Sequence, residues 1–192
     1  MIFIFEGMDN CLKDTLIQEL RQILSPETQV LKFSNPPMNL HDPELYQRRH
    51  FKDMFNLLAL SLANSDRNLI LNRAHLGEYV YSPIYRGYKA EWIFDLEREY
   101  LSNPYHSRST VLILLYDSSN EQLNLREDGH SLSLSEGGKL TAEREKFIEA
   151  FSQSLFLRKI KFDLSKFYFQ GDDLKKRVDI KSILETIISA AK

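Results

Sequence analysis

The chain has 192 residues, of which 43% are hydrophobic and 27% are charged, and this composition excludes an intrinsically disordered chain. Its 25 basic and 27 acidic residues give a net charge of −2. We therefore expect no broad basic surface and no nucleic-acid partner. The length fits one α/β domain that spans residues 1–192.

No apolar run reaches the ~18 residues that span a bilayer, so we expect no membrane association. The first residues, MIFIFEG, lack the basic segment and the small-residue cleavage site of a signal peptide. The single cysteine, Cys11, cannot form an internal disulfide, which fits a reducing compartment. Together these features predict a cytoplasmic protein.

Apolar runs typical of strands alternate along the chain with segments of helical periodicity. The runs favour strands over residues 2–5, 28–33, 68–71, 111–116 and 161–169, the last with a turn at Gly171. Apolar spacing favours helices over residues 13–24, 41–63 (one or two helices), 90–101, 141–157 and 180–188. This alternation is typical of a parallel sheet whose ligands bind at the carboxyl ends of the strands.

Two of the expected helices have a clear apolar face for the core. In the first helix that face carries Leu16, Leu20, Ile23 and Leu24. In the helix expected over residues 141–157 it carries Phe147, Phe151 and Leu155. Residues 118–140, which precede that helix, are polar and show little periodicity.

The first strand leads into GMDNCLKDT, residues 7–15, which half-matches the phosphate-loop pattern G-x-x-x-x-G-K-[ST]. Gly7 and Lys13 have the required spacing. Backbone N–H groups and the helix N-terminus of such a loop face a phosphate, and the lysine adds positive charge. Leu12 replaces the second glycine, so it must hold an unusual backbone or widen the loop. From the loop alone, an ordinary turn with a surface lysine stays open.

Asp14 stands where the pattern has the Ser or Thr that holds Mg²⁺. Its negative charge repels polyphosphate unless a divalent cation lies between them, and a carboxylate is a good ligand for such a cation. Thr15 offers a hydroxyl beside it.

Three motifs follow one another along the chain. They are FEGMDNCLKDT, the segment NRAHLGEYVYSPIYRGY at residues 72–88, and a polar segment with Arg126 before a helix that carries Glu143. Together they resemble the thymidylate kinase family, and within it the short deoxynucleoside-monophosphate kinases of bacteriophage type, over nearly the whole chain. The resemblance implies a three-layer α/β/α P-loop nucleoside monophosphate kinase fold. It also implies a five-stranded parallel sheet, and a lid at about residues 118–141.

The family transfers the γ-phosphoryl of ATP, with Mg²⁺, to the 5′-phosphate of a pyrimidine deoxynucleotide. For this chain the resemblance implies dTMP, or a 5-modified dUMP such as 5-hydroxymethyl-dUMP, as the acceptor. It also implies small-molecule nucleotide partners and a homodimer formed through helices on one face of the sheet. A phage-encoded protein of this kind would act in the host cytoplasm.

The resemblance assigns roles residue by residue. Lys13 matches the loop lysine, and Asp9 matches the acid that holds the sugar 3′-hydroxyl. Arg73 matches the arginine that grips the acceptor phosphate and can bridge to the donor. The residues expected to bind ATP are Asn10, Cys11, Leu12, Lys13, Asp14 and Thr15.

Asn72 falls where the family usually has Asp, and Asp14 adds a carboxylate nearby. We interpret the pair as an exchange of metal-ligand charge and predict that Asp14 and Asn72 hold Mg²⁺. Some family members keep an arginine where this chain has Asn10, so the catalytic arginine is expected from the lid. Arg126 is the candidate, and its alternative is a solvated loop arginine.

The acceptor pocket is expected to include an aromatic ring that stacks on the base. The family places a phenylalanine on the helix before the third strand, and the sequence does not choose between Phe51 and Phe55. Glu78 is a candidate for a sugar or base contact, or else a surface carboxylate. The full set of expected acceptor residues is Asp9, Phe51, Phe55, Arg73, Glu78, Tyr81, Tyr85 and Arg86.

Two other functions stay open at this point. Leu12, Asp14 and Asn72 support a kinase-fold nucleotide-binding or regulatory protein with weak or no turnover. This alternative is opposed by the presence of four separated polar residues of the expected site, because an inactive descendant has no reason to keep them. They are Asp9, Lys13, Arg73 and Arg126. A different acceptor, such as a hydroxymethyl group on a base in DNA, conflicts with the neutral net charge. The five histidines show no metal-ligand spacing, and His75 is interpreted as a core residue.

Overall fold

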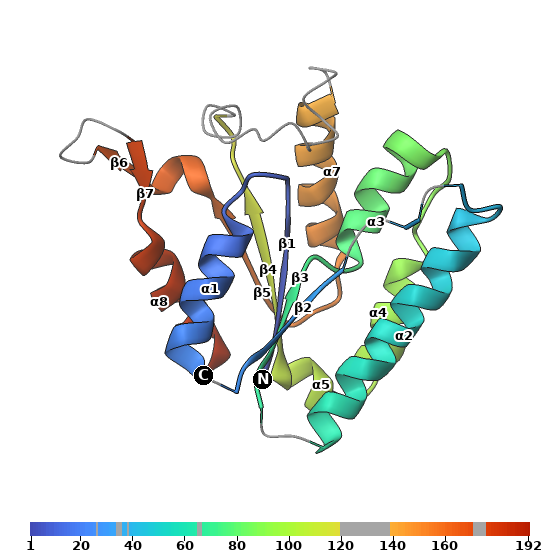
Figure 1. Ribbon diagram of the computed structural model, residues 1–192, viewed down its shortest axis with the longest axis horizontal. Coiled ribbons are helices and arrows are strands. Elements are labelled where there is room, and N and C mark those ends of the chain that lie inside the picture. The colour runs from blue at the N-terminus through green and yellow to red at the C-terminus, as the bar shows by residue number, and fades with distance from the viewer. Residues whose placement is uncertain (26, 34–35, 38, 65–66, 120–138, 171–175) are drawn as a thin grey trace.

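Five parallel strands form the central sheet (Figure 1). In order across the sheet they are β2 (Gln29–Lys32), β3 (Leu69–Asn72), β1 (Ile2–Gly7), β4 (Thr110–Tyr116) and β5 (Arg158–Asp163). The structure is a computed structural model, and it describes residues 1–25, 27–33, 36–37, 39–64, 67–119, 139–170 and 176–192.

Helices cover both faces of the sheet (Figure 1). One face carries α1 (Lys13–Leu24) and α8 (Ile180–Ala191). The other carries α2 (Pro43–Asn64), α3 (Leu76–Tyr81), α4 (Ile93–Leu101), α5 (Pro104–Ser109) and α7 (Lys139–Gln153). The expected three-layer α/β/α architecture with a five-stranded parallel sheet is confirmed. None of the helices in the described ranges is both long and apolar enough to cross a membrane.

Four short elements complete the described chain. A π-helix, η1 (Ser82–Arg86), continues α3, and a 3-10 helix, η2 (Leu164–Phe167), follows β5. The strands β6 (Tyr168–Gln170) and β7 (Lys176–Val178) form a separate antiparallel pair before α8.

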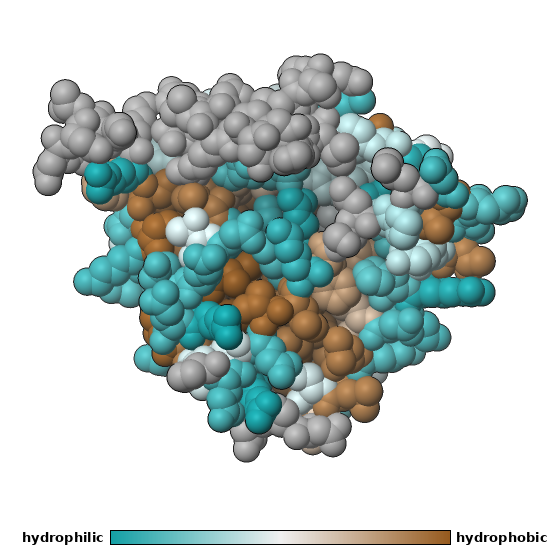
Figure 2. Space-filling model, in the orientation of Figure 1, coloured by the Kyte–Doolittle hydropathy of each residue, from teal (hydrophilic) through white to brown (hydrophobic). Residues whose placement is uncertain are grey.

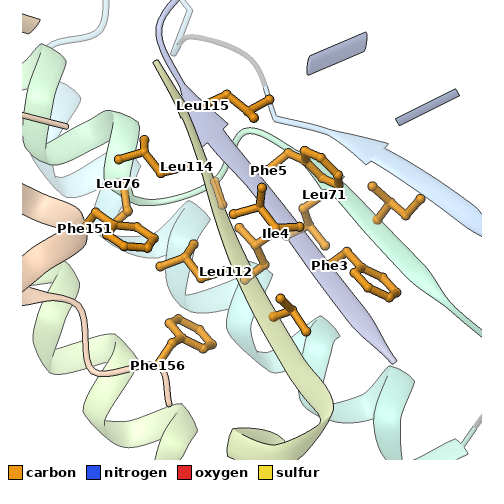
Figure 3. Close-up of a cluster of buried hydrophobic side chains, with 14 of the residues drawn as sticks. Phe3, Ile4, Phe5, Leu71, Leu76, Leu112, Leu114, Leu115, Phe151 and Phe156 are labelled. Carbon is orange, nitrogen blue, oxygen red and sulfur yellow. The ribbon is translucent and has the colours of Figure 1, made fainter. Parts of the chain in front are cut away.

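The core lies on both faces of β1, β3 and β4. All residues of β1 and β3 are buried, because their apolar side chains alternate between two helix-covered faces. Figure 3 shows Leu112 of β4 directed toward Phe151 and Phe156 on the α7 side. Phe3 and Phe5 point to the opposite face. This packing fixes the carboxyl ends of the central strands, where the expected site lies.

Some expected boundaries are wrong. The helix expected over 141–157 ends at Gln153, and Leu155 is 42% exposed beyond it. The strand expected over 161–169 is β5, which runs from Arg158 only to Asp163. There the Asp163 carboxylate accepts hydrogen bonds from Ser165 N at 3.3 Å and Ser165 Oγ at 2.8 Å, which turns the chain into η2. The turn expected at Gly171 lies outside the described residues.

Ile23 also departs from the expected core face, because its side chain is 55% exposed. It lines an apolar groove between α1 and α8 together with Ile180, Leu184 and Ile188. Figure 2 shows apolar surface on this side of the molecule. The helix α1 therefore buries a narrower stripe than its sequence predicts.

Candidate functional site

The loop after β1 holds left-handed backbone at two residues that are not glycine. Leu12 has a left-handed backbone with φ 58° and ψ 16°, and Asn10 has φ 61°. Of the two options for Leu12, the structure therefore has the unusual backbone. The carbonyl of Leu12 accepts the N–H of Leu16 at 3.0 Å, so α1 begins directly after this residue.

Gly7 is required where β1 ends. Its φ is 137°, and a Cβ at this position would lie 1.9 Å from the carbonyl oxygen of Leu115 in β4. Only glycine avoids this clash, and the left-handed side of the backbone map is strained for other residues. The start of the loop is thus fixed by the neighbouring strand.

Lys13 is buried and turned back into the loop. Its Nζ donates hydrogen bonds to the carbonyl oxygens of Gly7, at 2.9 Å, and Met8. Burial lowers the pKa of Lys13 to about 8. The alternative of an ordinary surface lysine is excluded, since only 5% of this residue is exposed.

Asp14 and Asn72 meet at the edge of the sheet. Asn72 Nδ2 donates to Asp14 Oδ1 at 2.5 Å, and Lys32 Nζ lies 3.9 Å from the same oxygen. The two residues of the predicted charge exchange are therefore neighbours. In the described part of the chain, no three His, Cys, Asp or Glu residues gather as a metal site. Mg²⁺ usually takes one or two protein oxygens plus waters and substrate phosphates, so the oxygens of Asp14 and Asn72 fit it.

Arg73 forms an ion pair with Asp9 across the gap between β3 and the loop. Arg73 has a left-handed φ of 69°, and its N–H donates to the carbonyl oxygen of Phe5 at 2.8 Å. Tyr81 lies beside the guanidinium and interacts with its charge. The residues expected to hold the acceptor phosphate and the sugar are therefore adjacent.

Five of the expected acceptor residues line one narrow cleft. They are Phe51, Arg73, Glu78, Tyr81 and Arg86. The rest of the lining comes from Glu6, Phe33, Gln47, Ala74, Gly77 and Phe147.

The structure separates the two candidate stacking rings. Phe51 lines the cleft, whereas the ring of Phe55 packs against His75 and Tyr100 at centroid distances of 5.1 and 5.2 Å. Tyr85 also lies outside the cleft lining. Its hydroxyl donates to the Glu143 carboxylate.

Glu78 is a buried carboxylate and not a surface one. It accepts hydrogen bonds from Gln47 Nε2 at 3.1 Å, Arg86 Nη1 at 2.5 Å and the Tyr88 hydroxyl. These partners come from α2, from η1 and from the residues after it. Glu78 therefore holds one wall of the cleft together.

Two cleft residues, Gln47 and Glu6, were missed by sequence reasoning. Gln47 Oε1 and Glu6 Oε2 are buried and have no hydrogen-bond partner within the described ranges. The other Glu6 oxygen accepts N–H groups from Ala74 at 3.1 Å and Leu76 at 2.8 Å, and burial raises the pKa of Glu6. Gln47 precedes Phe51 by one helical turn, and this shared face was the available signal.

The helix α7 brings a further carboxylate toward the site. Glu143 is 1% exposed, and burial raises its pKa to about 7. Its charge interacts with both Asp9 and Arg73. The predicted catalytic Arg126, and residues 120–138 of the expected lid, lie outside the described residues.

No protein-family model and no curated protein matches the chain, but solved structures do. It is similar to the YorR protein of Bacillus subtilis in complex with phosphorylated GDP, with a TM-score of 0.66 and 20% identity over 98% of this chain and 94% of that one. It is also similar to thymidylate kinase from Candida albicans, with a TM-score of 0.55 and 14% identity over 100% and 93% of the chains.

A third similar structure is deoxyadenosine kinase from M. mycoides with the products dCMP and dCDP. The TM-score is 0.53 at 14% identity, over 98% of this chain and 97% of that one. At these identities the likeness concerns the fold. The chain has the nucleoside monophosphate kinase fold.

Proposed function

We propose that the protein transfers the γ-phosphoryl of ATP to the 5′-phosphate of a pyrimidine deoxynucleoside monophosphate. The observation that carries this proposal is the meeting of Lys13, Arg73 and Asp9 at the carboxyl ends of β1 and β3. Two cations beside one acid, next to a cleft with aromatic walls, suit a triphosphate donor and a nucleotide acceptor.

Lys13 and Arg73 supply most of the chemistry in this proposal. Phosphoryl transfer passes through a loose transition state with charge on the equatorial oxygens, so positioned cations stabilise it. Lys13 leaves the loop carbonyls for the β and γ phosphates of ATP. Arg73, oriented by Asp9, binds the acceptor phosphate and reaches toward the donor. An ionised phosphate needs no base to become a nucleophile.

Asp14 and Asn72 would hold Mg²⁺ beside the donor. The metal neutralises charge on the donor phosphates when it is bound. The other residues of the loop, from Asn10 to Thr15, would contact ATP through backbone N–H groups and the start of α1.

The lining of the cleft suits the planar base of the acceptor nucleotide, at the opposite end of that molecule from its phosphate. Phe51 supplies a stacking ring, and Gln47 Oε1 offers an acceptor for an N–H on the base edge. Asp9 would hold the 3′-hydroxyl. The proposed acceptors are dTMP and 5-modified dUMP, including 5-hydroxymethyl-dUMP. The protein is further proposed to be a cytoplasmic homodimer, and Arg126 to complete the site from the lid.

A coupled assay of ADP release tests the proposal. The panel holds pyrimidine and purine deoxynucleoside monophosphates and the matching nucleosides, with and without Mg²⁺. Metal-dependent turnover of pyrimidine monophosphates is expected. Arg73→Ala should lower it by ~10³-fold or more. ATP binding without turnover on any acceptor would favour the regulatory alternative.

Glu6 favours a second candidate, a kinase that acts on nucleosides. Its buried Oε2 has no partner in the described part of the chain and lines the cleft beside Arg73. A hydroxyl acceptor, unlike a phosphate, needs a group that takes its proton. Glu6→Gln therefore separates the two candidates. It should abolish transfer to a nucleoside and largely spare transfer to a monophosphate.

A further inference from the structure

His75 and Glu97 form a buried pair behind the cleft. Both side chains are 0% exposed, and His75 Nε2 lies 2.5 Å from Glu97 Oε1. The His75 ring packs between the rings of Phe55 and Phe156, at centroid distances of 5.1 and 6.1 Å. Because an ionised carboxylate only accepts hydrogen bonds, Nε2 carries the proton.

Glu97 connects three parts of the chain. Besides His75 it accepts hydrogen bonds from Ser154 Oγ at 2.9 Å and from Leu155 N at 2.7 Å. Glu97 lies on α4, and Ser154 and Leu155 join α7 to β5. The carboxylate therefore ties the residues after Arg73 to two other elements.

The segment that begins at Arg73 forms much of the cleft wall. Arg73, Ala74, Gly77, Glu78 and Tyr81 all line it. The segment is fastened at two points by buried carboxylates, one through the N–H groups that Glu6 accepts and one through His75.

Stability alone does not account for the pair. A buried polar pair often contributes no more to stability than well-packed apolar residues of similar volume. The left-handed backbone of Arg73, with φ 69°, persists only where its surroundings over-determine it. The hydrogen bond of His75 to Glu97, two residues after Arg73, has a fixed direction and so restricts that backbone in a way that an apolar contact does not.

We infer that Glu97, acting through His75, is a positioning residue that holds Arg73 and the start of α3 in place for the acceptor nucleotide. This inference rests on the proposed function, since it concerns the acceptor side of that site. It predicts a much larger effect on the acceptor than on ATP, whose main contacts are proposed to lie in the loop before α1.

The test is Glu97→Gln, which keeps the shape of the side chain but replaces one carboxylate oxygen by an NH2 group. That group cannot accept the Leu155 N–H, so the side chain that holds His75 loses its anchor beyond α7. We expect kcat/KM for the acceptor monophosphate to fall about tenfold and KM for ATP to stay within about twofold. In an Arg73→Ala background the same change should alter kcat/KM less than twofold, since the residue acts through Arg73. The inference would be overturned if Glu97→Gln weakened the use of ATP as much as the use of the acceptor. It would also be overturned if Glu97→Gln still lowered kcat/KM about tenfold in the Arg73→Ala background.

Ser154→Ala provides a milder version if Glu97→Gln does not fold. It removes one hydrogen bond to Glu97 and should give the same pattern with a loss of about threefold. Thr110→Val is the matched control. It removes the buried hydrogen bond of 2.9 Å between Thr110 and Tyr100 of α4, without touching Glu97. It should lower stability and leave both KM values unchanged.

Calorimetric binding of the acceptor monophosphate separates the two proposals. A wild-type protein that binds the monophosphate and turns none over contradicts the proposed function. In that case the affinity for the monophosphate, compared by calorimetry between Glu97→Gln and wild type, still decides the inference. A wild-type protein that binds no monophosphate contradicts both proposals.

Discussion

Asn72 Nδ2 donates a hydrogen bond of 2.5 Å to Oδ1 of Asp14, although 58 residues separate the two in sequence. Asp14 belongs to the first turn of α1 and Asn72 to the end of β3. The contact therefore joins two of the positions where the chain departs from the expected motifs, the Ser or Thr of the phosphate-loop pattern and the aspartate after the third strand.

The first prediction concerns Mn²⁺ affinity in the ADP complex, measured by electron paramagnetic resonance. Asp14→Ser should weaken it about tenfold, because the only carboxylate of the pair is lost. Adding Asn72→Asp should restore most of the affinity, with a coupling energy of about 1 kcal/mol or more. If the effects of the two substitutions on Mn²⁺ affinity simply add in the double variant, the exchange of ligand charge is contradicted. With EDTA present, Asp14→Ser should instead tighten ADP binding, because a repulsive charge is removed.

The second prediction concerns two glycines with positive φ. Gly7→Ala should lower the free energy of unfolding by about 3 kcal/mol or more, because the new Cβ meets the Leu115 carbonyl at 1.9 Å. Gly87→Ala is the control. Its φ is 77° but nothing lies within 4 Å of the added carbon, so about 1 kcal/mol is expected. Urea unfolding measures both, and equal losses would contradict the steric argument.

The third prediction is that ADP binding takes up a proton at pH 9. The pKa of Lys13 is lowered to about 8 by burial, so the unliganded lysine is mostly neutral there. A bound phosphate favours the charged form and raises the pKa again. Calorimetry in buffers of different ionisation enthalpy should show uptake of nearly one proton at pH 9 and none from this group at pH 6.5. The variant Lys13→Met should show none at either pH.

The fourth prediction concerns Glu143, whose pKa is raised to about 7 by burial. Between pH 4.5 and 7 the folded state holds a proton that the unfolded state has lost, so this group makes stability fall as pH rises. The full effect is about 3 kcal/mol. Glu143→Gln should remove it, so the variant gains on wild type between pH 5 and pH 8 in urea unfolding. A constant difference between the two proteins would refute the assignment.

The fifth prediction separates Phe51 from Phe55. Phe51→Leu should raise KM for the acceptor about tenfold, in line with the ~1–3 kcal/mol that a stacked base contributes. Phe55→Leu should leave this KM unchanged and lower stability by about 1 kcal/mol, because its ring packs against His75 and Tyr100 and does not line the cleft. If Phe55→Leu raised the acceptor KM and Phe51→Leu did not, the two assignments would be reversed.

The sheet and the phosphate loop could be predicted from sequence because their signals are local. The strands β1 and β4 are continuous apolar runs, and Gly7 and Lys13 have a fixed spacing. The turns near residues 103 and 163 were harder to predict from the sequence. At α5, Asn103 caps the helix by accepting from Tyr105 N at 3.0 Å, an arrangement that apolar periodicity does not register.

The cleft beside Arg73 was predicted only in part, because its polar contacts join distant segments. Glu78 was named from its motif, but its bond to Gln47 spans 31 residues and has no sequence signature. His75 was correctly placed in the core. Its pairing with Glu97 depends on how α4 packs against the end of β3, which spacing does not reveal.

The left-handed leucine at position 12 has a consequence for how chains with a similar loop are found. Motif scans keyed to glycine letters will pass over any chain that reaches the same dihedral angles with a bulky side chain. Scanning structures for a torsion-angle string, with a buried lysine one residue later, would retrieve such chains and show how often this substitution has arisen.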